Sequence, residues 1–198
     1  YPLRRQRQMC IRDREILSDG LVKGMNKLGD DFSANRVFVP EMLIAARCMS
    51  AATELLKPYM VGESGESAAV GSAVIGTVRG DMHDIGKNLV KIMMEGSGIE
   101  VYDLGTDVSA EQFVETAVEH DCGIIACSSL LTTTMNEMRR VVSLAEKQGI
   151  RNKVRILIGG APISQSFCDE IGADVYTEDA GAAARAAVEI LKTCQNGK

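Results

Sequence analysis

The sequence predicts an α/β fold in which a parallel sheet of five strands carries helices on both faces and follows a shorter helical segment. Over the C-terminal two thirds of the chain, five short apolar runs alternate with five longer stretches of helical periodicity. The residues before them show helical periodicity only. The chain has 198 residues, of which 45% are hydrophobic, so it can bury the core of one ordinary domain plus a small second one.

The N-terminal helical segment is predicted over residues 15–61. Helical periodicity begins at Glu15 and ends at Gly29. After a polar loop, a second helix opens at Pro40, because proline is tolerated in the first turn, and stops at Pro58. Two helices bury too little surface to be stable alone. They therefore either pack on the domain that follows or belong to a larger bundle.

The segments that flank these helices lack an apolar period. Residues 1–14 are rich in arginine, and we expect them to be non-native or disordered. Residues 62–72 read Gly-Glu-Ser-Gly-Glu-Ser-Ala-Ala-Val-Gly-Ser, which is typical of a flexible linker. The α/β domain is therefore expected over residues 73–198.

The alternating elements of that domain define a doubly wound sheet. Five strand–helix units favour the common flavodoxin-like (Rossmann-like) strand order 2-1-3-4-5. The apolar runs predict strands at 73–78, 99–103, 122–127, 154–158 and 174–176. The periodic stretches predict helices at about 86–97, 109–120, 133–148, 162–171 and 179–193.

Three unusual segments follow strands of this sheet. Asp81-Met82-His83-Asp84-Ile85-Gly86 follows strand 1, a loop of serines and threonines over 128–134 follows strand 3, and Gly159-Gly160 follows strand 4. With this strand order, the first two segments meet at the crevice where the winding reverses. A histidine with a nearby carboxylate in such a turn is typical of a metal ligand. Taken singly, these features also fit an exposed histidine, helix capping and a tight turn.

Composition excludes several other classes of function. The net charge is −5 without a basic stripe, which argues against nucleic-acid binding. No apolar run reaches the ~18 residues of a membrane span. The six cysteines form no Cys-x-x-Cys pair, so they predict neither a zinc framework nor a disulfide scaffold. These features predict a cytoplasmic protein.

The motifs together resemble a known family. Asp81-Met82-His83-Asp84-Ile85-Gly86, then Ser128-Ser129-Leu130, then Gly159-Gly160 is similar to the pattern of the corrinoid (cobalamin-binding) proteins of methylamine- and methanol-type methyltransferase systems. These proteins are related to the cobalamin-binding module of methionine synthase. Residues 37–43 look like the start of the last helix in the family's four-helix cap. The resemblance spans residues 15–193, and it implies that the cap is truncated here.

The resemblance also implies the cofactor, cobalamin or a related corrinoid, and the roles of individual residues. His83 would be the lower axial ligand of cobalt in place of the cofactor's own base. Asp81 would hydrogen-bond the far ring nitrogen of His83, and Thr134 would complete that relay. Ser128 and Thr132 would contact the displaced nucleotide tail. The implied cofactor-binding residues are Gly80, Asp81, Met82, His83, Asp84, Ile85, Gly86, Ser128, Leu130, Thr132, Thr134, the space-making pair Gly159 and Gly160, Ala180 near the corrin edge, and Phe38 and Met42 on the methyl-bearing side.

The resemblance predicts a methyl carrier rather than a complete enzyme. Its partners would be a substrate-specific methyltransferase, a second methyltransferase that accepts the methyl group, and a reductive activase. The alternatives are the cobalamin domain of a mutase and a cobalamin-dependent sensor or regulator. A phosphoacceptor receiver domain is excluded, because it needs an aspartate in place of Ser128 and a lysine in place of Thr177. The methyl donor stays open among methylamines, methanol, glycine betaine and methoxyaromatics.

Overall fold

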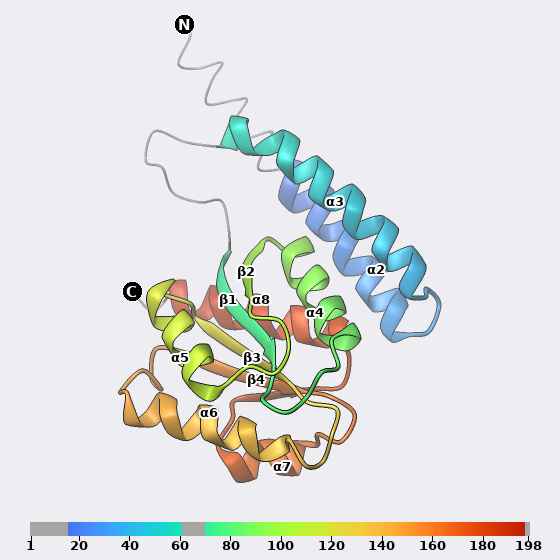
Figure 1. Cartoon of the computed structure of the whole chain (residues 1–198). Helices are drawn as coiled ribbons and strands as arrows, with labels where there is room; N and C mark the ends of the chain where they lie inside the picture. The colour runs from blue at the N-terminus through green and yellow to red at the C-terminus, as the bar shows by residue number, and fades with distance from the viewer. Residues whose placement is uncertain (1–15, 61–69, 197–198) are drawn as a thin grey trace, which may run out of the picture.

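A computed structural model of the chain describes residues 16–60 and 70–196 (Figure 1). It confirms the predicted α/β fold: all five strands are parallel and their order is β2-β1-β3-β4-β5. Strand and helix ends differ from the predicted ones by at most three residues within this domain. The strands are β1 (Gly71–Thr77), β2 (Ile99–Asp103), β3 (Ile124–Ser128), β4 (Arg155–Gly159) and β5 (Val175–Thr177).

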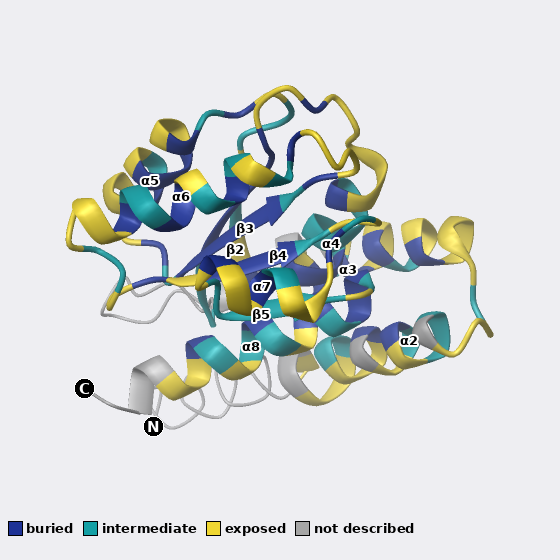
Figure 2. Cartoon of the chain, turned by 90° about the horizontal axis from the view of Figure 1, so that it is seen from below, coloured by how far each residue is buried: buried dark blue, intermediate teal, exposed yellow. Residues whose placement is uncertain are grey.

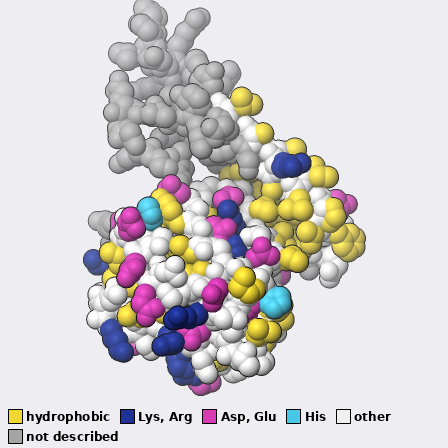
Figure 3. Space-filling model, in the orientation of Figure 1, with side chains coloured by type: hydrophobic (Ala, Val, Ile, Leu, Met, Phe, Trp, Pro, Cys, Tyr) yellow, Lys and Arg dark blue, Asp and Glu magenta, His cyan; other side chains and the backbone are white. Residues whose placement is uncertain are grey.

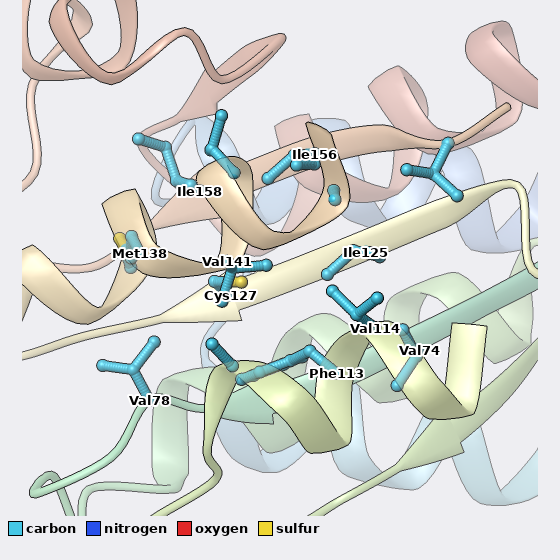
Figure 4. Close-up of a cluster of buried hydrophobic side chains, with 14 of the residues drawn as sticks. Val74, Val78, Phe113, Val114, Ile125, Cys127, Met138, Val141, Ile156 and Ile158 are labelled. Carbon is cyan, nitrogen blue, oxygen red and sulfur yellow. The ribbon is translucent and has the colours of Figure 1, made fainter. Parts of the chain in front are cut away.

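Helices cover both faces of the sheet. One face packs against α5, α6 and α7, and its core consists mainly of Val, Ile and Phe side chains such as Val74, Phe113 and Ile156 (Figure 4). The other face packs against α4 and α8 through alanines and methionines such as Met94 and Ala187. The helices are α4 (Ile85–Gly96), α5 (Ala110–Glu119), α6 (Met135–Lys147), α7 (Gln165–Ile171) and α8 (Ala180–Asn196).

The N-terminal helices form a cap that packs on the α4–α8 side of the sheet (Figure 1). They are a π-helical turn η1 (Ile16–Val22), followed by α2 (Lys23–Ser33) and α3 (Val39–Met60). Met25, Met42 and Ala46 belong to the same buried cluster as Met93 and Met94 of α4. The cap therefore shares its core with the α/β domain. Of the two arrangements that the sequence left open, the helices adopt the one in which they pack on the domain that follows.

Two predicted helix boundaries in the cap are wrong. Gly29 was expected to end the first helix, but α2 continues to Ser33. Gly29 instead allows close packing, because a Cβ there would lie 2.7 Å from the Met93 Cε atom. Pro58 was expected to stop the second helix, but α3 runs on to Met60. A proline removes one hydrogen bond from a helix without ending every helix that contains it.

The segments predicted to flank the cap fall largely outside the described residues. The expected non-native segment 1–14 lies wholly outside them, as do residues 62–69 of the expected linker. Gly71 and Ser72, which were also placed in the linker, belong to β1 and pair with β2. Among residues 16–60 and 70–196, no helix is both long and apolar enough to cross a membrane.

Buried residues line the sheet and the inner faces of the helices, whereas the loops at the strand ends are largely exposed (Figure 2). Gly160 follows β4 and has a φ of 133°, a conformation that favours glycine. A Cβ on Gly160 would lie 1.8 Å from the Ser129 carbonyl oxygen. The chain's own backbone therefore fills the space beside Gly160, so the glycine sets how closely the loops after β3 and β4 approach each other.

We predict that Gly160→Ala lowers the free energy of unfolding by about 2–5 kcal/mol, because the added methyl group meets backbone and the φ angle becomes strained. Denaturant unfolding followed by circular dichroism measures this loss. Gly86→Ala is the matched control, since a Cβ there meets nothing within 4 Å and alanine favours a helix. Equal stability of the two variants would contradict the predicted clash.

Candidate functional site

The turn after β1 places Asp81 inside the protein and His83 at its surface. The Asp81 N–H donates to the Val78 carbonyl at 3.1 Å, and Gly80 between them has a φ of 82°. A positive φ at the third position of such a turn is a conformation that favours glycine. The Asp81 side chain is fully buried, whereas the His83 side chain is 52% exposed. The turn thus joins an internal carboxylate to an accessible imidazole.

The Asp81 carboxylate accepts hydrogen bonds from two different loops. Its Oδ1 atom lies 2.6 Å from His83 Nδ1 and accepts the His83 backbone N–H at 3.1 Å. Its Oδ2 atom accepts the N–H groups of Leu130 and Leu131 at 2.7 and 3.2 Å. The Thr134 hydroxyl also lies 3.2 Å from Oδ2. The histidine turn and the loop after β3 are therefore joined through one side chain, as the predicted strand order requires.

These hydrogen bonds keep Asp81 ionised. Burial by itself raises the pKa of this carboxyl group, but hydrogen bonds from Leu130, His83 and Leu131 outweigh it and lower the pKa to about 2. An ionised carboxylate can only accept hydrogen bonds. The His83 Nδ1 atom must therefore carry a proton that it donates to Asp81, and in the neutral tautomer that donates from Nδ1 the lone pair for a metal is on Nε2.

Two side chains that support this pair were missed in the sequence. Ser129 is fully buried, and its hydroxyl lies 2.8 Å from the Thr134 hydroxyl. Thr77 is also fully buried at the end of β1, and its hydroxyl donates to the His83 carbonyl at 2.7 Å. The sequence feature that could have identified them is their position at the ends of the two central strands, where buried hydroxyl groups require hydrogen-bond partners.

A groove of about 510 Å³ runs beside the sheet between α4 and α8. It brings together several predicted site residues from segments that are distant in the sequence: Gly86, Ser128, Gly159, Gly160 and Ala180. Most of its remaining lining is apolar and comes from residues of β1, β3, β4, α4 and α8, such as Ile75, Ala126, Leu157 and Ala183. Gly86, which closes the histidine turn, also lines this groove, so the space lies next to that turn.

The remaining predicted residues lie around the groove or away from it. Met82, Ile85 and Leu130 are exposed apolar side chains, with exposed fractions of 70%, 79% and 43%. Asp84 is exposed and precedes α4, and Thr132 is exposed but does not line the groove.

The two site residues predicted in the cap, Phe38 and Met42, differ in exposure. Phe38 is exposed just before α3, where the Glu41 carboxylate accepts its backbone N–H at 2.7 Å. Met42 was expected to face a bound cofactor, but it is fully buried among the cap helices and α4. The apolar stripe of α3 that contains Met42 packs inward, so in this structure Met42 contacts protein rather than an open surface, and its contact with a cofactor stays a prediction. Hydrophobic side chains nevertheless cover much of the cap's visible outer surface (Figure 3).

The site offers one metal ligand rather than a set. Within residues 16–60 and 70–196, no three His, Cys, Asp or Glu side chains lie close enough to hold a metal ion. A single imidazole suits a metal whose other ligands belong to a cofactor. The apolar groove beside the imidazole suits the organic part of such a cofactor.

Comparison with known proteins identifies the class to which this fold and site belong. Residues 71–189 match a family model described as a B12 binding domain, and residues 7–57 match a second model with the same description. The second match begins within the segment that was expected to be non-native. The chain is thus a B12-binding protein with an N-terminal helical B12-binding region.

The relatives narrow this class. Dimethylamine corrinoid protein 1 of Methanosarcina acetivorans is 44% identical over 89% of this chain and 83% of its own length. A cobalamin-binding protein from Desulfitobacterium hafniense superposes with a TM-score of 0.79 at 31% identity, over 91% of this chain and 84% of that one. The methanol:cobalamin methyltransferase complex MtaBC from Methanosarcina barkeri gives a TM-score of 0.77 at 28% identity, over 89% of this chain and 67% of the chain from that complex. The chain belongs to the corrinoid proteins of the methylamine and methanol methyltransferase systems.

We predict that Asp81→Asn destabilises the cofactor-free protein in a pH-dependent way. The folded-state pKa of Asp81, about 2, lies below the ordinary value of 3.8. Its ionised form therefore stabilises the fold above about pH 4, and this contribution is lost as the pH falls towards 2. The difference in unfolding free energy between wild type and variant should be largest near pH 7 and shrink between pH 4 and 2.

Denaturant titrations from pH 2 to 7 measure this difference. Asp84→Asn replaces an exposed carboxylate in the same turn, and at pH 7 it should change the unfolding free energy by less than about 0.5 kcal/mol. A wild type and Asp81→Asn variant of equal stability at pH 7 would contradict the proposed role of the buried carboxylate.

Proposed function

We propose that this chain is a methyl carrier that binds a corrinoid with its own base displaced and His83 on the cobalt. One observation carries the proposal: His83, with Nδ1 held by Asp81 at 2.6 Å, stands beside a groove of about 510 Å³ that is lined by Ser128, Gly159 and Gly160. The carrier would pass a methyl group from a substrate-specific methyltransferase to a second methyltransferase.

The residues present fit a corrinoid. A corrin supplies four nitrogens to its cobalt, so the protein needs to add only one axial ligand, and Nε2 of His83 is the free nitrogen. The groove would accept the displaced nucleotide tail, and its small residues, Ala126 and Ala183 among them, leave that space open. The exposed apolar side chains of Met82, Ile85 and Leu130 would lie beneath the ring. Phe38 would stand on the methyl-bearing side.

The protein's own part in the chemistry is to hold a proton between Asp81 and His83 and to orient the His83 imidazole. When bound, the corrinoid supplies a strongly nucleophilic cobalt that accepts and releases methyl groups. Asp81 fixes the tautomer of His83 and can strengthen or weaken the imidazole as a donor through the proton that they share. Thr134, backed by Ser129, holds the other carboxylate oxygen through hydroxyl hydrogen bonds. Activation of the methyl donor falls to the partner, because the described site contains no general acid aimed at a substrate.

We predict that the bound corrinoid takes its axial nitrogen from the protein. Protein labelled with ¹⁵N and loaded with unlabelled cobalamin in the Co(II) state should show the doublet splitting of ¹⁵N in its EPR spectrum, whereas a cofactor that keeps its own base shows the ¹⁴N triplet. His83→Ala should lose the doublet. His120→Ala, which changes the other histidine of the chain, is the matched control and should keep it. A ¹⁴N triplet in the labelled wild-type protein would refute the assignment of His83.

We predict that methyl transfer depends on a partner enzyme. Incubated alone with corrinoid, a reductant and dimethylamine, the chain should form no monomethylamine. Addition of a dimethylamine-specific methyltransferase should yield monomethylamine in an amount stoichiometric with the carrier. Dimethylamine is the first donor to test, since the dimethylamine corrinoid protein is 44% identical, against 28% for the methanol system.

Methanol with its own methyltransferase is the parallel test of the donor class. Higher yield with methanol would reassign the donor, whereas sustained turnover by the isolated chain would overturn the carrier proposal.

A further inference from the structure

Asp107, in the loop between β2 and α5, has an unusual backbone conformation. Its φ angle is 57°, in the left-handed region that few residues other than glycine, asparagine and aspartate adopt. The loop that contains it is fixed to β1. The Leu104 N–H donates to the Ile75 carbonyl at 2.8 Å, and the Val108 N–H donates to the Thr77 carbonyl at 3.0 Å. Asp107 is thus anchored to the central strand on both sides.

From this position Asp107 holds the peptide that leads into the histidine turn. Its carboxylate Oδ1 atom accepts the Gly80 N–H at 2.7 Å. Its own N–H donates to the Asp81 carbonyl oxygen at 3.0 Å. Two hydrogen bonds from one residue therefore fix the backbone on both sides of the Gly80–Asp81 peptide bond.

We propose that Asp107 is a positioning residue for the axial ligand His83. This inference rests on the proposed function, in which His83 binds cobalt. The loop after β3 holds the side chain of Asp81, whereas Asp107 holds its backbone from the opposite side. Gly80 is the most freely rotating residue of the turn. Without the carboxylate of Asp107, the peptide after Gly80 can rotate, which displaces Asp81 and with it the His83 ring that Asp81 orients.

The left-handed conformation allows the side chain and the backbone of Asp107 to be tested separately. Asp107→Gly keeps the backbone unstrained and removes only the acceptor for Gly80. Asp107→Asn keeps an acceptor oxygen and tolerates the same φ angle. Asp121→Gly is the matched control: Asp121 is also an exposed aspartate with a positive φ, 46°, but it precedes β3 at the opposite end of the sheet.

The experiment measures the axial ligand directly in ¹⁵N-labelled protein loaded with Co(II) cobalamin. Asp107→Gly should lower the fraction of the EPR signal with ¹⁵N splitting and weaken corrinoid affinity roughly tenfold, the effect of one hydrogen bond to a charged group. Asp107→Asn and Asp121→Gly should retain the wild-type signal. In the cofactor-free protein, Asp107→Gly should also speed hydrogen exchange of the Gly80 amide.

The outcomes separate this inference from the proposed function. A wild-type ¹⁵N signal and affinity in Asp107→Gly would overturn the role of Asp107 while leaving His83 as the ligand. A loss of signal in Asp121→Gly equal to that in Asp107→Gly would also overturn it, since the effect would then follow from general destabilisation. An unchanged ¹⁵N signal in His83→Ala would overturn both proposals.

Discussion

The buried, ionised carboxylate of Asp81 is the constraint on which the site depends. A charge without access to water is costly unless hydrogen bonds compensate for it, and here the donors come from the histidine turn and from the loop after β3. Each loop therefore supplies donors to the same buried carboxylate. The parallel pairing of β1 with β3 makes the arrangement possible, because it brings the carboxyl ends of the two strands to the same edge of the sheet.

The sequence was sufficient to predict most of the α/β domain and the centre of its site. Strand and helix periods are local signals, and the strand order followed from the rule for doubly wound sheets. The strand order placed the histidine turn beside the loop of serines and threonines, whereas the grouping of Asp81, His83 and Thr134 came from the resemblance to the corrinoid proteins. Two polar supports, Ser129 and Thr77, were missed although they lie at the ends of central strands, because the partners of their hydroxyl groups are known only from the structure.

Tertiary packing accounts for three features of the structure that the local sequence pattern does not show. Gly29 was expected to end a helix, because glycine is a common helix terminator. In the structure it lies within α2 and packs closely against Met93, a residue far along the chain. Met42 read as a cofactor contact, yet the cap rests on α4 and buries it. Gly160 was expected to make room for a ligand; it does line the groove, but a Cβ there would also meet the Ser129 carbonyl oxygen. Each position depends on a neighbour that no local pattern reveals.

The two sides of the sheet differ in stiffness, and this follows from their cores. The face under α5, α6 and α7 is built from branched and aromatic side chains such as Val141, Ile158 and Phe113, which have few rotamers and resist rearrangement. The opposite face meets the cap through Met25, Met93 and similar unbranched thioethers, which refill space readily when their surroundings move. The cap therefore rests on the α/β domain through side chains that can repack. His83 lies two residues before α4, the helix that carries Met93, so the contact between the cap and α4 is joined through one helix to the turn that holds the imidazole.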